Sequence, residues 1–198
     1  MSSRREPATP EEDAEPLNAR IAQRVRDLRA AGGLSLEALA ARSGVSRSMI
    51  SLVERGETSP TAVVLEKLAT GLGVALAALF DAPRPSGSPV ARRAEQPVWR
   101  DPHSGYLRRN LSPAGTGSPI QVVEVMFPPG ARVAYETGLR LPLIHQQLWV
   151  LEGSIEVTLG DEHHRLDAGD CFAHVLDRPM TYHNPTKKTA RYAVVIAS

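Results

Sequence analysis

The hydrophobic pattern of this chain changes its period once, at residues 82–98, and this change restricts the folds that the chain can adopt. Before this segment, apolar residues recur every three or four positions, which is typical of packed helices; the first such run is Leu17, Ile21, Val25 and Leu28. After it, short alternating runs are separated by Gly, Pro, Asp and Asn turns, which is typical of antiparallel strands. Residues 82–98 are rich in proline and small residues and follow neither period, so we interpret them as a linker.

This change of period predicts an α+β chain of two domains. The helical domain is expected at residues 17–81, after a tail at residues 1–16 that is rich in Pro, Glu and Ala and that we expect to be disordered. The second domain is expected at residues 99–198 as an antiparallel sandwich or barrel. Its expected strands are YLRRNL, IQVVEVMF, ARVAYE, IHQQLWVL, SIEVTLG, HHRL, DCFAHV, MTYHN and TARYAVVIA.

Glycine, serine and proline divide the helical domain into five short helices. Ser35 can cap the second helix, and Ser59 followed by Pro60 is typical of a helix start, here that of the fourth helix. A fifth helix is expected around residues 76–80, where it would close a compact bundle.

Composition excludes several classes of protein. No apolar run approaches the roughly 18 residues of a membrane span, and no apolar stretch follows the first arginines, so we expect neither a membrane segment nor a secretory signal. The single cysteine, Cys171, cannot form an internal disulfide and is expected to be a small core residue. We therefore expect a cytoplasmic protein without a membrane partner. The net charge is +1, with its positive excess between residues 17 and 98, which is mild for a nucleic-acid binder.

The stretch GVSRSMISLVERG, residues 44–56, predicts a short amphipathic helix after a glycine turn. So short a helix must be held by its neighbours, and Val45, Ile50 and Val53 form the face that can pack on them. Two helices joined by such a turn match the helix-turn-helix geometry, in which the second helix enters the major groove. The residues expected to contact DNA here are the cap, Ser46, and the outward-facing side chains, which are the candidates for base contacts: Arg47, Ser48, Ser51 and Leu52.

Phosphate contacts are expected on both sides of this helix. The N-terminus of the preceding helix, at Ser35, can bind an anion, and Arg42, Arg55 and Thr58 can donate to phosphate oxygens. The alternative is that these helices form a packing or protein-binding module whose serines are exposed caps.

Residues 34–74 resemble the DNA-binding domain of the XRE family of bacterial regulators, in register from Gly44 through the Glu54-Arg55-Gly56 run to Ser59-Pro60. The resemblance implies an ion pair between Arg29 and Glu54. Leu36 departs from the glutamine that many members carry, so a common phosphate contact is not expected there.

Residues 150–172 resemble the centre of a cupin, a small β-barrel, and the likeness extends over residues 119–197. Many cupins bind a metal through three histidines and a glutamate. Here those positions hold poor ligands: Gln146, Met180, and either Leu139 with Leu141 or Arg140 with Pro142. The resemblance therefore implies a barrel without a metal or other cofactor. His174 has no assigned place, so an unusual metal site stays open.

A barrel without metal can still bind a small molecule in its interior. The expected lining comes from the central strand and a later one: Gln146, Leu148, Val150, Met180 and Tyr182. Glu124 is a second candidate, as a carboxylate that could receive a cation or lie at an edge. Tyr135, Glu136 and Arg140 are expected at the mouth of the barrel or in a solvated loop.

Three functions follow from these features. The first is a transcription regulator, a repressor by family habit, that binds a near-palindromic DNA operator as a homodimer and senses a small-molecule effector in its cupin domain. The second is a DNA-tethered cupin metalloenzyme, against which the missing ligands weigh. The third is a regulator without an effector, in which the barrel serves only to dimerise.

Overall fold

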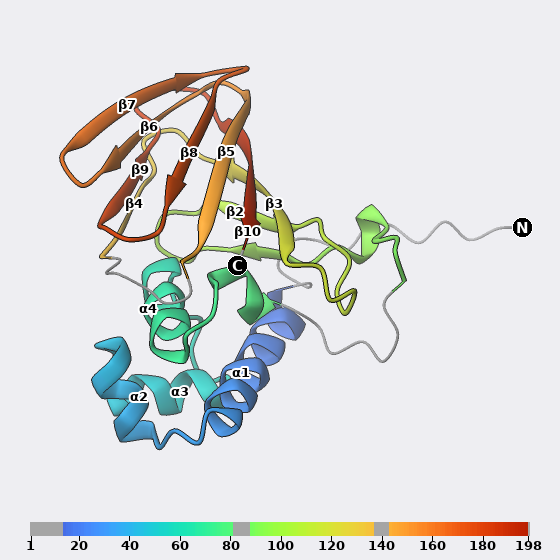
Figure 1. The fold of residues 1–198 in the computed structure, drawn as a ribbon, viewed down its shortest axis with the longest axis vertical. Helices are drawn as coiled ribbons and strands as arrows, with labels where there is room; N and C mark the ends of the chain where they lie inside the picture. Colours follow the sequence, from blue (N-terminus) through green and yellow to red (C-terminus); the bar gives the residue numbers. More distant parts are fainter. Residues whose placement is uncertain (1–13, 81–87, 137–142, 198) are drawn as a thin grey trace, which may run out of the picture.

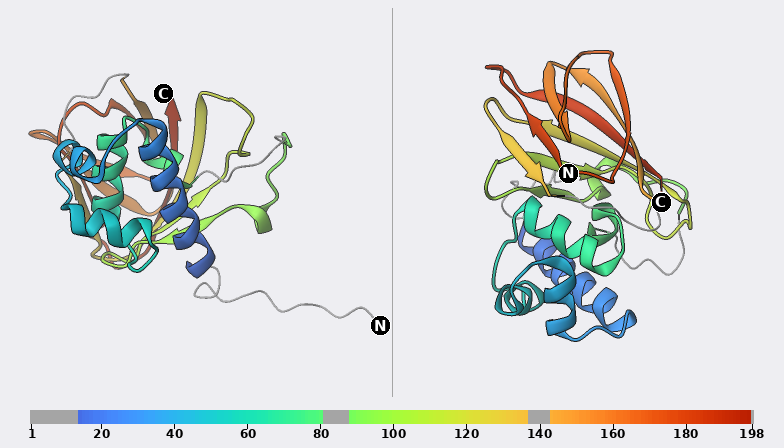
Figure 2. Two further views of the ribbon diagram at one scale, coloured as in Figure 1. Left: turned by 90° about the horizontal axis from the view of Figure 1, so that it is seen from below. Right: turned by 60° about the vertical axis from the view of Figure 1, so that its left-hand side comes forward.

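A computed structural model describes residues 14–80, 88–136 and 143–197, and in these ranges the two-domain α+β organisation is confirmed. Helices pack beneath one end of a pair of antiparallel sheets (Figure 1; Figure 2, right). Within the described ranges, no helix combines the length and apolar character needed to cross a membrane.

The helical domain contains four α-helices in its described residues rather than the expected five: α1 (Ala14–Ala31), α2 (Leu36–Ser43), α3 (Arg47–Glu54) and α4 (Ala62–Leu72). The fifth segment, η1 (Leu76–Phe80), is a 3₁₀ helix. Five residues offer few α-helical hydrogen bonds, so the tighter turn is held by the burial of Ala77, Leu79 and Phe80.

The start of α2 is confirmed, and the expected start of α4 is wrong. The Ser35 hydroxyl accepts from the amide of Ala38 at 3.0 Å, as a cap does. The cap of α4 is Thr61, not Ser59. The hydroxyl of Ser59 accepts instead from Asn18 Nδ2 at 2.9 Å and ties the loop to α1, so the helix begins after Pro60.

Helices α2 and α4 approach each other closely at Gly71. A Cβ at this position would lie 2.8 Å from Ser43 Cβ and 3.0 Å from Leu39 Cδ1, closer than side-chain atoms normally approach. The absence of a side chain therefore allows α4 to support α2.

All strands expected from the sequence are present, and a further one, β1, precedes them. One sheet has six strands in the order β1 (Val98–Arg100), β2 (Leu107–Asn110), β3 (Ile120–Phe127), β10 (Ala190–Ala197), β5 (His145–Glu152) and β8 (Cys171–Val175). The other has the order β4 (Arg132–Tyr135), β9 (Met180–His183), β6 (Ser154–Leu159) and β7 (Glu162–Asp167). Strand β1 begins at Val98, the last residue of the expected linker.

The expected closed barrel is not observed, and this prediction is wrong. Within the described residues the strands form two separate antiparallel sheets, and no strand pairing joins one to the other. Alternating hydrophobicity specifies only that each strand has an inner face, which a double sheet satisfies as well as a barrel does. The inner faces bury Phe127, Leu148, Ile155 and Met180.

Cys171 is exposed, so its assignment to the core is wrong. Its register partner on β5 is Trp149, which is 52% exposed, and both lie on the outer face of the six-stranded sheet. Alternation along β8 places His174, three residues on, on the buried face instead.

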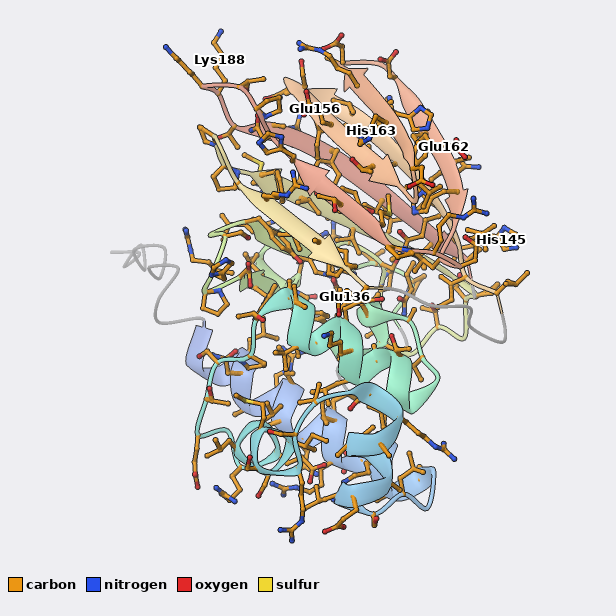
Figure 3. The ribbon with its side chains drawn as sticks, turned by 90° about the vertical axis from the view of Figure 1, so that its left-hand side faces the viewer. Glu136, His145, Glu156, Glu162, His163 and Lys188 are labelled. Atoms are coloured by element: carbon orange, nitrogen blue, oxygen red, sulfur yellow. The ribbon has the colours of Figure 1, made fainter. Side chains whose placement is uncertain are left out.

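The two domains share a continuous packed boundary. The amide of Ala62, at the start of α4, donates to Asp101 Oδ1 at 2.9 Å, and Lys67 pairs with Glu136 at 2.9 Å (Figure 3). The ring of Phe80 contacts Trp99 edge-on, with centroids 5.7 Å apart. Movement of the helices on the sheets would therefore disrupt both polar and aromatic contacts.

We expect Gly71→Ala to destabilise the protein. Overpacking costs about 1–3 kcal/mol, against roughly 1 kcal/mol gained in helix propensity, so the free energy of unfolding should fall by on the order of 1 kcal/mol. Urea denaturation followed by circular dichroism measures it. Gly32→Ala is the matched control, because a Cβ there meets no atom closer than 3.4 Å. Unchanged stability of Gly71→Ala would contradict the close approach of α2 and α4.

Candidate DNA-binding helix and ligand cavity

Helix α3 has one buried face and one polar face, as its sequence predicts. Ile50 and Val53 are buried, and the hydroxyl of Ser46 caps the helix by accepting from the amide of Met49 at 3.2 Å. Arg47 and Ser48 are exposed, whereas the outward residues Ser51 and Leu52 are half-buried. The turn before the helix is closed by Gly44 at φ 67°, a conformation that favours glycine.

The position of α3 is fixed by a paired charge at its end. Arg29 on α1 donates from Nε and Nη2 to the two carboxylate oxygens of Glu54, at 2.6 and 2.8 Å, which confirms the ion pair implied by the resemblance. Glu54 is buried, and Arg29 Nη1 also donates to the carbonyl of Leu34 at 2.9 Å. The hydrogen bond to Glu54 raises the pKa of Arg29. A two-point, charge-assisted contact of this kind holds the helix in a defined orientation.

The exposed arginines of this region carry neighbouring carboxylates. Arg47 Nε lies 2.5 Å from Glu37 Oε1 of α2, and both side chains are 66% exposed. Arg55 donates to both oxygens of Glu57, at 2.6 and 2.8 Å, and the hydrogen bond lowers the pKa of Glu57. Exposed ion pairs contribute little to stability, so these arginines can exchange their partners for an anion at small cost.

The other residues predicted to contact phosphate lie around α2 and after α3. Ser35 is exposed at the N-terminus of α2, Arg42 is exposed in its last turn, and Thr58 is half-buried. Their contacts with DNA stay predictions.

A cavity lined mainly by the two sheets brings together four of the residues predicted to line a ligand site: Tyr135, Gln146, Met180 and Tyr182. Leu148 and Val150, also expected there, are fully buried and are not part of the lining. The cavity reaches the helical domain, because Glu66 of α4 and Leu76 of η1 also line it. It is therefore a site between domains rather than the interior of a separate barrel.

The remaining predicted ligand residues lie elsewhere. Glu124 does not line this cavity; its carboxylate lies 3.0 Å from Arg191 and 3.5 Å from Arg109. Glu136, expected at the mouth, follows β4 and pairs with Lys67. Arg140 lies outside the described residues.

Sequence reasoning missed the charged and aromatic residues that complete the lining. Arg108 on β2 is buried, with its guanidinium carbon 5.2 Å from the centre of the Phe80 ring. Tyr106 and Tyr192 line the same space, and the hydroxyls of Tyr106 and Tyr135 lie 3.3 Å apart. Consecutive arginines at 108 and 109 require, by alternation, that one point inward, but the pattern does not indicate which.

Comparison with known proteins places these features in context. Residues 25–79 match the helix-turn-helix family model HTH_3. The chain is 25% identical to the HTH-type transcriptional regulator SutR of Escherichia coli (strain K12), over 87% of this chain and 91% of that protein. It is 24% identical to the HTH-type transcriptional regulator PuuR of the same organism, over 85% and 90%. An HTH_3 family transcriptional regulator from Vibrio cholerae has a similar structure, with a TM-score of 0.74 and 27% identity over 93% of this chain and 98% of that one.

His174 lies buried on β8 without joining a metal site. No group of three or more His, Cys, Asp or Glu side chains that could hold a metal ion occurs among the described residues. Neither ring nitrogen of His174 has a hydrogen-bond partner in the described part of the chain, and the ring stacks on Phe172 with centroids 5.3 Å apart. Burial lowers the pKa of His174 to about 4, against a smaller opposing effect of Asp177.

This buried histidine should make stability depend on pH. Between the ordinary value of 6.5 and about 4, the unfolded chain binds a proton that the folded chain does not, so stability is lost as the pH falls through this range. Between pH 7 and pH 5, His174→Leu should lose about 2 kcal/mol less of its unfolding free energy than the unmodified protein loses. Urea denaturation at both pH values measures it.

The control is His145→Leu, on the exposed end of β5, which should retain the full pH dependence (Figure 3). Parallel pH profiles of His174→Leu and the unmodified protein would contradict a buried neutral histidine.

Proposed function

We propose that this chain, whose residues 25–79 match the helix-turn-helix family, is a DNA-binding transcriptional regulator that places α3 in the major groove. The observation that carries the proposal is the arrangement of α3. Its apolar face is buried, its end is fixed by the Arg29–Glu54 pair, and its exposed face offers Arg47 and Ser48. An arginine on a rigid helix is suited to the O6 and N7 atoms of guanine.

Phosphate contacts would orient the helix on the duplex. The N-termini of α2 and α3, capped by Ser35 and Ser46, present amides and positive helix-dipole ends, and Arg42, Arg55 and Thr58 can add donors around them. Because Arg47 and Arg55 leave Glu37 and Glu57 on binding, affinity should also depend on those carboxylates.

We also propose that the regulator acts as a homodimer on a near-palindromic operator. A recognition helix as short as α3 contacts few bases, and two copies related by twofold symmetry double the number that are read. Sedimentation equilibrium should give about twice the 21.4 kDa chain mass. Repression, the direction of regulation that we propose, follows from the resemblance alone.

The cavity between the domains supports a sensing role for the second domain. A ligand there would touch α4 and η1 as well as the sheets, so it can have different affinities for two placements of the helices. The alternative of a DNA-tethered metalloenzyme is tested by metal analysis of the purified protein, in which stoichiometric iron, manganese or zinc would support it. A ligand-independent regulator would show no thermal stabilisation with any metabolite.

We expect Arg47→Ala to weaken binding to an operator selected in vitro from random duplexes by about 1–3 kcal/mol, the value of one bidentate base contact. Binding to scrambled duplex should change little. Fluorescence anisotropy at fixed salt measures both, because salt alone changes such affinities strongly. Arg165→Ala, exposed on β7, is the matched control and should leave both affinities unchanged.

Two other outcomes would change the interpretation. An equal loss on operator and scrambled duplex would make Arg47 a phosphate contact. Failure of the unmodified protein to enrich any sequence from the pool would contradict the proposed function itself.

A further inference from the structure

The cavity between the domains contains a buried cation with an unused edge. Arg108 is 6% exposed, and its Nε and Nη2 atoms have no hydrogen-bond partner among the described residues. These two nitrogens form one edge of the guanidinium, and their parallel N–H bonds match the two oxygens of a carboxylate. A buried donor without a partner is costly, so this edge favours an acceptor that enters the cavity.

The surroundings of Arg108 suit a small carboxylate rather than a larger or more charged anion. Most of the lining is apolar or aromatic, including Leu76, Val125 and Met180. The space that the centre of a water molecule can reach is about 50 Å³, compared with roughly 10–15 Å³ for a single water. Among the described residues the lining carries one cation, Arg108, and one carboxylate, Glu66, so a dianion such as phosphate would add more uncompensated negative charge than a monoanion.

Tyrosine hydroxyls add neutral donors to this environment. Burial raises the pKa of Tyr106 to about 12 and raises that of Tyr135 well above its ordinary value. Both hydroxyls are therefore protonated at neutral pH and can donate to an anion. An amine ligand could pair with Glu66, but it would leave the Nε and Nη2 edge of Arg108 without an acceptor.

One wall of the cavity belongs to the DNA-binding half of the chain. Glu66, on α4, is buried, and its negative charge contributes to the raised pKa of Tyr106, Tyr135 and Tyr182, after the larger effect of burial. The other side of α4 meets α2 at Gly71. A second carboxylate in the cavity would repel Glu66, and α4 is placed to pass that force to the helix-turn-helix.

We propose that this cavity binds a short-chain monocarboxylate on the Nε and Nη2 edge of Arg108, and that the bound charge acts on Glu66 to change the affinity of the helices for DNA. The second half of this proposal rests on the function proposed above, and the first half does not. The apolar lining receives the alkyl chain, and the tyrosine hydroxyls share the carboxylate oxygens.

Titration calorimetry without DNA, in a carboxylate-free buffer, tests the ligand class. The probes are the unbranched acids from acetate to hexanoate, with the amide and the primary amine of the same chain length, and inorganic phosphate. We expect saturable binding of one or more acids and at least tenfold weaker binding of the amide, the amine and phosphate. Equal binding of amide or amine, or no binding of any acid at millimolar concentration, would overturn the proposal.

Two arginine variants locate the site. Arg108→Lys keeps the charge but loses the two-point geometry, and it should weaken acid binding at least tenfold. Arg109→Lys is the matched control, because the next residue on the same strand lies beside Glu124 and outside the cavity. Circular dichroism shows whether each variant folds. If Arg108→Lys does not fold, the comparison of acid with amide binding to the unmodified protein decides the proposal. Weakening by Arg109→Lys alone would place the acid beside Arg109 and Glu124, outside the cavity, and overturn the proposal.

Glu66→Gln tests the coupling. Removing the like charge should tighten acid binding severalfold and should abolish the effect of the acid on DNA affinity. If the unmodified protein binds the acid but its affinity for the selected operator does not change, the proposed coupling is overturned and the proposed ligand site stands. If the unmodified protein selects no DNA sequence, the calorimetric result still stands, so failure of the regulator function is distinguished from failure of the site.

Discussion

Helix α4 is the element on which both halves of the molecule depend. Its first amide, from Ala62, is satisfied by the carboxylate of Asp101, which is 2% exposed and belongs to the sheet domain. The same carboxylate accepts from the amide and hydroxyl of Ser104, at 2.8 and 2.5 Å. Separation of the domains would break this hydrogen bond and exchange a contact between an amide and a charged carboxylate for contacts with water. The start of α4 is therefore anchored in the sheets while its later turns support α2.

Local signals in the sequence were sufficient for most elements and insufficient for their assembly. Ser35 and Ser46 cap their helices as predicted, because a cap depends on hydrogen bonds within four residues. The local pattern misplaces the start of α4, because Ser59 has a distant partner, Asn18, that no local pattern indicates. Strand alternation located the strands but could not distinguish two open sheets from a closed barrel.

The cavity illustrates the same limit at the candidate site. Alternation and the family resemblance predict lining residues within the sheet domain, and four of the residues that they indicate line the cavity in the structure: Tyr135, Gln146, Met180 and Tyr182. Glu66 could not be identified in this way, since in sequence it is an ordinary polar position on an amphipathic helix. Its burial follows from the packing of α4 against β4 and the tyrosines, a contact between domains that the proline-rich linker gave no reason to expect.

The chain carries exposed ion pairs near α3 and a buried cation in the cavity between the domains. The pairs on and beside α3, Arg47 with Glu37 and Arg55 with Glu57, are exposed, so water and salt screen them and a polyanion can replace their carboxylates. Arg108 is buried. Screening is weak in a buried environment, so a change in charge there interacts strongly with neighbouring charged groups. A ligand changes an equilibrium only through a difference in its affinity for two states. The buried site can supply such a difference because α4 contributes a charge to it, and α4 cannot shift without disturbing α2.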